Sequence, residues 1–444
     1  MDEEDKGKPD EQAAPEKKTH PIAHDIKSYV KTIDSLKESL SMSMRVIQTV
    51  HKEYVKRYNQ FVDKNCVAEG EGDKGSRNIP IEHYTRFTAL ASRVEKTSIA
   101  FDVVPRSFLV ALVSEYDAFL GKLLASIFRL QPEMLKASER TLSFSQLSEF
   151  SSIEDARDYV LEKEVENFLR QSHSDQFKSL EERFKLPLRK DLQAWAPFIE
   201  VTERRNLFVH AGGAVSRQYI QNCREHGVVH ETPVEAGLQL SVPWKYFVHA
   251  HAVLLEIGVK LAQVLWRKVQ PTEIGEADKS LSNLTYGLLS EKSYSLAKTL
   301  LDFALLTLKK HESEHSRLVF LVNRAQAYKW GGEPQVALKI MEDTDWSATS
   351  STFRLAHAVL TDNFHLAASL MEQIGPNGNP HKVEYRDWPL FRDFRKSPEF
   401  KDTYEKVFGE AFFESDEAGT LDPAPEQKPS DMPNSGDANG PLIQ

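Results

Sequence analysis

The sequence predicts an all-α protein, and three patterns in its 444 residues indicate this fold class. Large side chains recur every seven residues between positions 26 and 61. Residues 81–270 have a helical pattern of apolar side chains almost throughout. Residues 276–413 contain three similar segments, spaced 40 and 30 residues apart. The length predicts about two or three folded units.

Both ends of the chain are acidic, and the part between them is nearly neutral. Residues 1–20 contain seven acidic and four basic residues, and residues 414–444 contain seven and one. This leaves 52 acidic and 51 basic residues for positions 21–413, within a total net charge of −10. Both ends are rich in proline, glycine and charged residues, so we predict that they are disordered tails. The acidity therefore does not argue against nucleic-acid binding by the folded part.

Composition excludes several classes of protein. No uninterrupted run of about eighteen apolar residues occurs, so we expect no membrane contact. The polar N-terminus has no apolar core segment, so it does not resemble a secretory signal. The two cysteines, Cys66 and Cys223, are too few for a disulfide framework or a thiolate zinc site. We therefore expect a cytoplasmic protein.

Residues 21–68 are predicted to form one long amphipathic helix that resembles a coiled-coil strand. Neither glycine nor proline interrupts its repeat, which consists of Ile26, Ile33, Leu40, Ile47, Tyr54 and Phe61. The alternate positions are filled less regularly, by Tyr29, Leu36 and Val50. Such a narrow apolar seam packs either against helices of the same chain or against a second copy. The sequence leaves both possibilities open.

A turn-rich stretch, residues 69–80, separates this helix from a second helical unit at 79–270. Its clearest helix is 105–130, and we expect Pro105 to begin that helix because proline suits a first turn. Ser114, Glu115 and Asp117 interrupt its apolar run. Such a polar cluster faces the surface or a cleft.

The third unit, residues 276–413, repeats weakly. When Ala297, Ala337 and Ala367 are aligned, the residues three positions before each alanine also align. Large apolar residues align three and four positions after it. The earlier residues are Tyr294, Pro334 and Phe364, and the later ones are Leu300, Ile340 and Leu370, followed by Leu301, Met341 and Met371. Stacked helix pairs need a small residue where two helices cross. The unit resembles degenerate tetratricopeptide repeats, which implies binding of a protein partner; a purely structural stack is the alternative.

The candidate site lies in a predicted helix that Pro197 begins and that Gly212 and Gly213 end. On an ideal helix Glu203, Asn206 and His210 fall within about 60° of one another. Arg205 lies about 140° from His210, so its side chain must reach around the helix or the helix must distort. In the last turn, the helix dipole favours a protonated ring on His210.

Residues Arg205–His210, RNLFVH, match the R-x(4–6)-H motif of the HEPN superfamily, including the polar residue after the arginine. The unit at 79–270 therefore resembles a HEPN domain. The resemblance implies an antiparallel helical bundle, a homodimer in which two motif helices share one cleft, and metal-independent endoribonuclease activity. Arg204 also has the required spacing from His210 and is a rival for the arginine role. The motif fits three other places, Arg45–His51, Arg77–His83 and Arg224–His230, but none of them has the same helical setting.

The residue types suit RNA cleavage. RNA carries its own nucleophile, the 2′-hydroxyl, so we expect neither a metal nor a cofactor. His210 can transfer protons near neutral pH, and Arg205 can bind the scissile phosphate. Asn206, Glu203 and Asp117 are auxiliary candidates. The resemblance implies a role in defence or toxin-like RNA cleavage; the alternative is a non-catalytic HEPN adaptor that dimerises and recruits a protein partner.

Overall fold

The computed structural model describes residues 19–69, 76–135 and 142–413, and within them the chain forms sixteen α-helices and one short strand pair. The prediction of an all-α fold is confirmed. The two predicted acidic tails lie outside the described residues, apart from Thr19 and His20. His20 caps the first helix, because its Nδ1 accepts a hydrogen bond from the backbone of Ile22.

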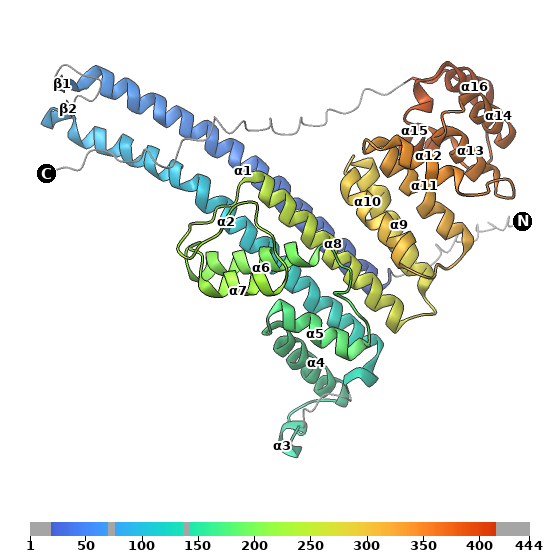
Figure 1. The fold of residues 1–444 in the computed structure, drawn as a ribbon, viewed down its shortest axis with the longest axis horizontal. Helices are drawn as coiled ribbons and strands as arrows, with labels where there is room; N and C mark the ends of the chain where they lie inside the picture. Colours follow the sequence, from blue (N-terminus) through green and yellow to red (C-terminus); the bar gives the residue numbers. More distant parts are fainter. Residues whose placement is uncertain (1–18, 70–75, 136–141, 414–444) are drawn as a thin grey trace, which may run out of the picture.

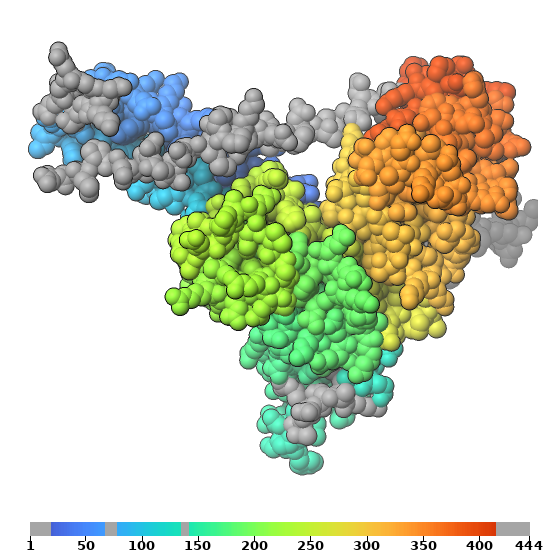
Figure 2. Space-filling view, in the orientation of Figure 1, coloured from blue at the N-terminus to red at the C-terminus, as the bar shows by residue number. Residues whose placement is uncertain are grey.

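Two very long antiparallel helices, α1 (Pro21–Asn65) and α2 (Ile81–Leu130), dominate the molecule (Figure 1). The strands β1 (Val67–Glu69) and β2 (Ser76–Asn78) pair antiparallel between them. The outer part of the hairpin projects from the rest of the protein (Figure 2). We call residues 41–66, which comprise the last part of α1 and Cys66 after it, together with residues 78–98 the two-helix arm.

The seam of α1 packs against α2 of the same chain. Of the two possibilities left open by the sequence, the structure therefore shows packing against helices of the same chain. In the arm, His51 bonds to the Thr97 hydroxyl at 2.8 Å, and the ring of Tyr58 lies 5.6 Å from that of Phe87. Val50 lies off the seam and is 37% exposed. In the arm, the residues that accompany the seven-residue repeat on the seam therefore come four positions after each repeat residue, as His51 follows Ile47, and not three positions after it.

Pro105 does not begin a helix, so this prediction was wrong. The helix α2 starts 24 residues earlier at Ile81, and Pro105 lies buried in its interior. A proline removes one backbone hydrogen bond from a helix. Here the helix continues because it is packed on both sides of the proline: Phe101 lies beside His51 of α1, and Leu109 is fully buried in the core.

A helical bundle surrounds the inner half of the hairpin. The helix α8 packs against both α1 and α2, and α6 packs against α2, α7 and α8. Gly258 of α8 lies at the closest approach, where a β-carbon would be 2.6 Å from Cε1 of Tyr29. The helices of this region are η1 (Pro132–Leu135), α3 (Phe144–Leu147), α4 (Ile153–Leu169), α5 (His173–Phe184), α6 (Trp195–His210), α7 (Arg217–Glu225) and α8 (Trp244–Val269).

By length and composition alone, α2 and α8 among the described helices are apolar enough to cross a membrane. In α8, 67% of the apolar window is buried inside the protein, as in the core helix of a bundle. In α2 only 22% of the window is buried. The expectation of no membrane contact remains a prediction.

Three helix pairs follow the bundle: α9 (Ile274–Ser290) with α10 (Tyr294–Asp302), α11 (Glu314–Trp330) with α12 (Pro334–Glu342), and α13 (Ser351–Leu360) with α14 (Phe364–Ile374). A π-helical turn, η2 (Phe303–Thr307), extends α10. The chain ends in α15 (Lys382–Asp387), η3 (Pro389–Phe391), η4 (Phe394–Lys396) and α16 (Pro398–Phe408).

The three pairs share one turn geometry. The middle residue of each turn, Lys292, Gly332 or Asp362, has a positive φ of 60°, 89° or 58°. The next backbone N–H donates to a carbonyl five residues earlier, at 2.8 to 2.9 Å in all three. The second helix of each pair begins at the residue that the sequence alignment placed first, and the aligned alanines are at most 1% exposed. These segments are therefore structural repeats.

The hydrophobic core does not stop where the second predicted unit ends. One cluster of buried residues extends from α1 through α8 and across to α9, α10 and Phe320 and Ala327 of α11. A second cluster begins at Leu318 and reaches Tyr404. The first helix pair thus packs on the bundle, and the border between cores runs through α11.

We predict that Gly258→Ala destabilises the protein by about 1–3 kcal/mol, because Tyr29 cannot yield. Its ring stacks on Phe119 at 4.3 Å, and its hydroxyl donates to the Leu254 carbonyl at 2.8 Å. The control is Gly287→Ala in α9, where a β-carbon meets nothing within 4 Å. That change should stabilise the helix by about 0.5–1 kcal/mol. Urea unfolding measures both; equal effects would contradict the close approach.

Candidate functional site

The helix α6 is fixed by its buried side and by its C-terminal end. Phe198 and Val201 are fully buried in the core. After His210, the backbone of Ala211 and of Gly213 donates to the Leu207 carbonyl, at 2.8 and 3.0 Å, and Gly212 and Gly213 adopt positive φ. The glycine pair therefore ends the helix as the sequence predicted.

Arg205 is held by the predicted auxiliary residue Asp117. Its Nη2 donates to Asp117 Oδ2 at 3.0 Å, and the other carboxylate oxygen lies 2.9 Å from His173 Nε2. The side chains of Arg205, Asp117 and His173 are 20%, 30% and 11% exposed. The Nε of Arg205 is buried and has no hydrogen-bond partner among the described residues. Three helices, α2, α5 and α6, thus meet in one Arg–Asp–His cluster.

His173 is the member of this cluster that the sequence did not predict. It is the first residue of α5, after the N-cap Ser172, and its ring stands edge-on to Phe198 at 5.5 Å. It is 56 residues from Asp117. The sequence indicated this cluster only through the polar residues that interrupt the apolar run at Asp117, and they did not identify which residue Asp117 contacts.

Arg204 belongs to a different, structural network. Its Nε donates to Glu200 Oε1 at 2.7 Å, and its guanidinium lies 3.9 Å from the centre of the Tyr246 ring. The hydroxyls of Tyr219 and Tyr246 also donate to Glu200, each at 2.7 Å. Burial and the Glu200 charge raise the pKa of both tyrosines. Because Arg204 is engaged here, the geometry favours Arg205 for the arginine role.

The face predicted for Glu203, Asn206 and His210 is turned away from the Arg–Asp–His cluster. Burial, together with the charges of Glu200 and Glu203, raises the pKa of the Cys223 thiol on α7 to about 12. On an ideal helix Glu203 lies about 160° from Arg205, and Arg205 bonds to Asp117 of α2. Among the described residues no hydrogen bond or ion pair joins Glu203, Asn206 or His210 to Arg205. The structure brings Asp117 to Arg205 and leaves the other three on a separate face.

His210 is exposed at the end of α6 and forms no hydrogen bond or ion pair with the described part of the chain. The loop after it is attached to α2, because Arg106 donates to the carbonyls of Gly212 and Leu240 at 3.1 and 3.4 Å. Arg106 also lies over the Phe208 ring at 5.2 Å. The imidazole is therefore accessible from solvent at a fixed place beside α2.

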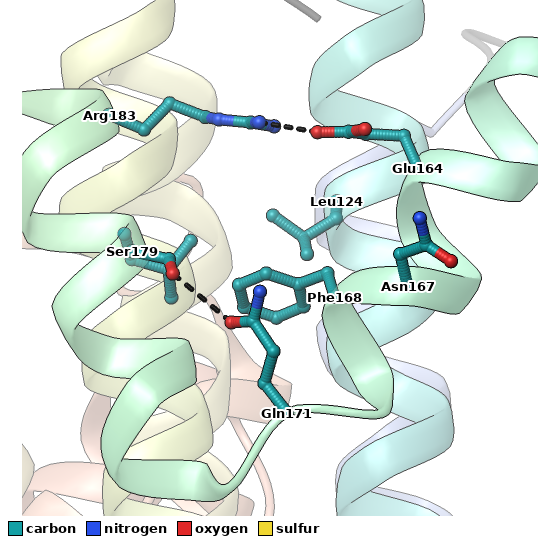
Figure 3. A pocket seen from close by; sticks show the side chains of 8 residues that line it. Leu124, Glu164, Asn167, Phe168, Gln171, Ser179 and Arg183 are labelled. Carbon is teal, nitrogen blue, oxygen red and sulfur yellow. Dashed lines mark hydrogen bonds and ion pairs between the residues drawn. The ribbon is translucent and has the colours of Figure 1, made fainter. Parts of the chain in front are cut away.

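A pocket of about 230 Å³ opens between α4 and α5, with Leu124 of α2 in its lining (Figure 3). Arg183 and Glu164 form an ion pair at one side, and Ser179 donates to Gln171 at 3.1 Å at the other. Leu124 is seven residues, or about 10 Å, along α2 from Asp117. The pocket includes neither Arg205 nor His210 and is separate from the candidate site.

In the described part of the chain, no three His, Cys, Asp or Glu side chains come together in a group that could hold a metal ion. His249 and His251 point differently, as their spacing predicts. His249 is exposed, whereas His251 is 1% exposed and bonds to Asp34 at 2.8 Å.

We predict that Glu200→Gln costs about 3–5 kcal/mol of stability, because it leaves the mostly buried Arg204 without its counter-charge. Tyr246→Phe removes one hydrogen bond and should cost about 1 kcal/mol. Glu203→Gln is the control, since Glu203 forms no hydrogen bond or ion pair with described residues; its change should stay within about 0.5 kcal/mol. Urea unfolding compares the three. A loss for Glu200→Gln no larger than for Glu203→Gln would contradict the network's role.

Comparison with known proteins gives no relative from which a function could be taken: no family model, no curated protein and no solved structure matches this chain.

Proposed function

We propose that the protein is a metal-independent endoribonuclease of HEPN type that acts in defence or toxin-like RNA cleavage. One observation carries this proposal: an accessible His210 ends the same helix on which Arg205 is fixed by Asp117. A nuclease of this type needs a proton-transferring group open to the substrate and a cation held in place for the phosphate.

In the proposed reaction, His210 removes the proton of a ribose 2′-hydroxyl, and the 2′-oxygen attacks the adjacent phosphorus. The bond from phosphorus to the 5′-oxygen breaks, and a second, protonated histidine donates a proton to that oxygen. The products are a 2′,3′-cyclic phosphate and a 5′-hydroxyl. Arg205 uses one nitrogen for Asp117, which leaves further N–H donors for the phosphate. Asp117 is a positioning residue, and Asn206 and Glu203 are auxiliary groups beside His210.

The geometry of α6 gives this reaction a reason to involve a homodimer. Each chain offers one His210, whereas the reaction needs a base and an acid. Arg205 and His210 also occupy different faces of one helix. A second copy supplies the second histidine and brings an arginine to it. We place this reaction in the cytoplasm, without a cofactor or membrane.

A second candidate function is a non-catalytic adaptor that dimerises and recruits a protein partner through the C-terminal helix pairs. The exposed apolar side chains of the arm favour this candidate. Met42, Val46 and Val50, each four residues apart on α1, are 58%, 62% and 37% exposed. A stripe of this kind on a helix suits contact with another protein.

The first test measures RNA cleavage by the full-length protein in EDTA. His210→Ala should lower the rate by about 10²–10⁴-fold, the usual contribution of a proton-transferring side chain. Arg205→Lys should not restore the loss seen in Arg205→Ala, because lysine lacks the planar set of donors. The matched control is His249→Ala, an exposed histidine elsewhere, which should leave the rate unchanged. Cleavage that needs a divalent metal, or that survives His210→Ala, would refute the nuclease proposal.

The adaptor is tested by the mass of the protein in solution. Size-exclusion chromatography with light scattering should show a dimer for the wild type and a monomer for Val46→Glu/Val50→Glu, because two charges interrupt the apolar stripe. Val383→Glu, at a residue of α15 that is 65% exposed, is the control and should remain dimeric. A wild type that stays monomeric, or a variant that stays dimeric, would remove the stripe as the dimer contact.

A further inference from the structure

One edge of the two-helix arm carries a row of positive charges. The guanidinium of Arg93 lies 5.6 Å from the Tyr54 ring centre, and that of Arg86 lies 5.7 Å from the Phe61 ring centre. Arg93 and Arg86 of α2 therefore lie beside Tyr54 and Phe61 of α1, respectively. Arg57 comes between the two rings in sequence, and Lys64 follows shortly after Phe61.

These four cations occupy equivalent positions of the two helices. Arg57 directly precedes the seam residue Tyr58, and Arg86 directly precedes its partner Phe87. Lys64 and Arg93 are each seven residues further along their own helices, on the same faces. In an antiparallel pair, equivalent flanking positions meet along one edge, where coiled coils place opposite charges. We call Arg57, Lys64, Arg86 and Arg93 the cationic edge.

Little acidic charge balances this edge. All four side chains are exposed, and of the four only Arg57 forms an ion pair with a described residue, Glu53 at 2.7 Å. The arm as defined contains eight lysines and arginines against four acidic residues. The connecting residues 67–77 add two basic and three acidic residues. Like charges at such positions destabilise a helix pair slightly, and a bound polyanion relieves that repulsion.

The edge has the shape of a binding site for a linear polyanion. From the level of Tyr54 to Lys64 it spans ten residues of helix, or about 15 Å. Four cations in a row over that length suit successive phosphates better than one small anion. Arg106, which holds the loop after His210, lies thirteen residues or about 20 Å along α2 from Arg93. Thirteen residues also turn Arg106 about 140° around α2 from Arg93, so an RNA strand that extends from the edge to the candidate site must cross α2 as well.

We propose that the cationic edge binds the phosphate backbone of single-stranded RNA next to the segment that is cleaved. This proposal rests on the ribonuclease function proposed above. The edge adds affinity without reading sequence, because phosphate contacts carry no base information. Arg86 and Arg93 are kept in place by their rings, so they lose less freedom on binding than unsupported side chains.

The experiment measures binding of a labelled 20-nucleotide single-stranded RNA by fluorescence anisotropy over a range of KCl concentrations. The full-length protein carries His210→Ala, so that RNA is not consumed. Adding Lys64→Gln/Arg86→Gln/Arg93→Gln should weaken binding at 100 mM salt by at least about tenfold. The slope of log affinity against log salt concentration should become shallower by about 2, which is about 0.7 per lost phosphate contact. Arg86→Lys/Arg93→Lys, which keeps both charges, should bind the RNA with nearly the affinity of the His210→Ala protein.

Lys309→Gln/Lys310→Gln removes two exposed cations elsewhere and should leave binding unchanged. Thermal unfolding checks that the triple variant is folded. With His210 intact, the triple variant should lose more activity on the 20-nucleotide RNA than on a dinucleotide, because so short a substrate does not reach the edge. Loss of RNA binding without any His210-dependent cleavage would retain the edge and refute the nuclease. The proposal would be overturned if the triple variant bound RNA as well as its parent, or if the control lost as much binding. It would also be overturned if the protein bound only phosphatidylserine vesicles or a peptide of residues 414–444.

Discussion

The close approach of α8 to the α1–α2 hairpin is the contact on which the rest of the structure depends. Gly258 has no side chain where the stacked rings of Tyr29 and Phe119 pass, and Tyr29 bonds to the backbone of α8 itself. The other parts are attached to α8 from both of its ends. Near its start, Tyr246 bonds to Glu200 and so positions α6. Near its end, Arg267 bonds at 2.6 Å to the buried Asp278 of α9, which also accepts hydrogen bonds from His311 and from the backbone of Glu312. These bonds lower the pKa of Asp278 although burial opposes the shift, so the carboxylate stays charged and links α8, α9 and the segment just before α11.

This attachment explains the geometry of the candidate site. The regular helix α6 keeps Arg205 and His210 on different faces, and its contacts through Glu200 and Arg205 hold it in that form. Breaking a buried ion pair costs about 3–5 kcal/mol, more than most surface contacts can return. In the proposed reaction, a substrate or a second copy of the chain would therefore have to bring the arginine and histidine functions together. The exposed end of α6, attached to α2 through Arg106, is the place where this can happen.

The sequence predicted those features that depend on neighbours along the chain. The seven-residue repeat predicted α1, the glycine pair predicted the end of α6, and the aligned Tyr294, Pro334 and Phe364 predicted where three helices begin. It could not predict features that depend on packing between distant segments. Asp117 and Arg205 are 88 residues apart, and nothing local identifies His173 as the third member of their cluster. Pro105 was misplaced for the same reason, since its local preference for a helix start is weaker than the packing of α1 along the whole of α2.

Net charge is a poor guide to what this protein binds, and the structure indicates why. The two ends of the chain carry −9 of the total of −10, while the part between them is nearly neutral. A nearly neutral body still has a local field wherever charges of one sign lie together, and that field extends about 10 Å at ordinary salt. The cationic edge meets this condition, because four positive side chains follow one another along it and Glu53 neutralises only Arg57 in part. Repulsion among such exposed charges costs only a few tenths of a kcal/mol per pair, far less than the burial of Phe61 and its neighbours along the seam provides. The arm can therefore keep an uncompensated row of cations without loss of its fold, and that row is free to act on a polyanion.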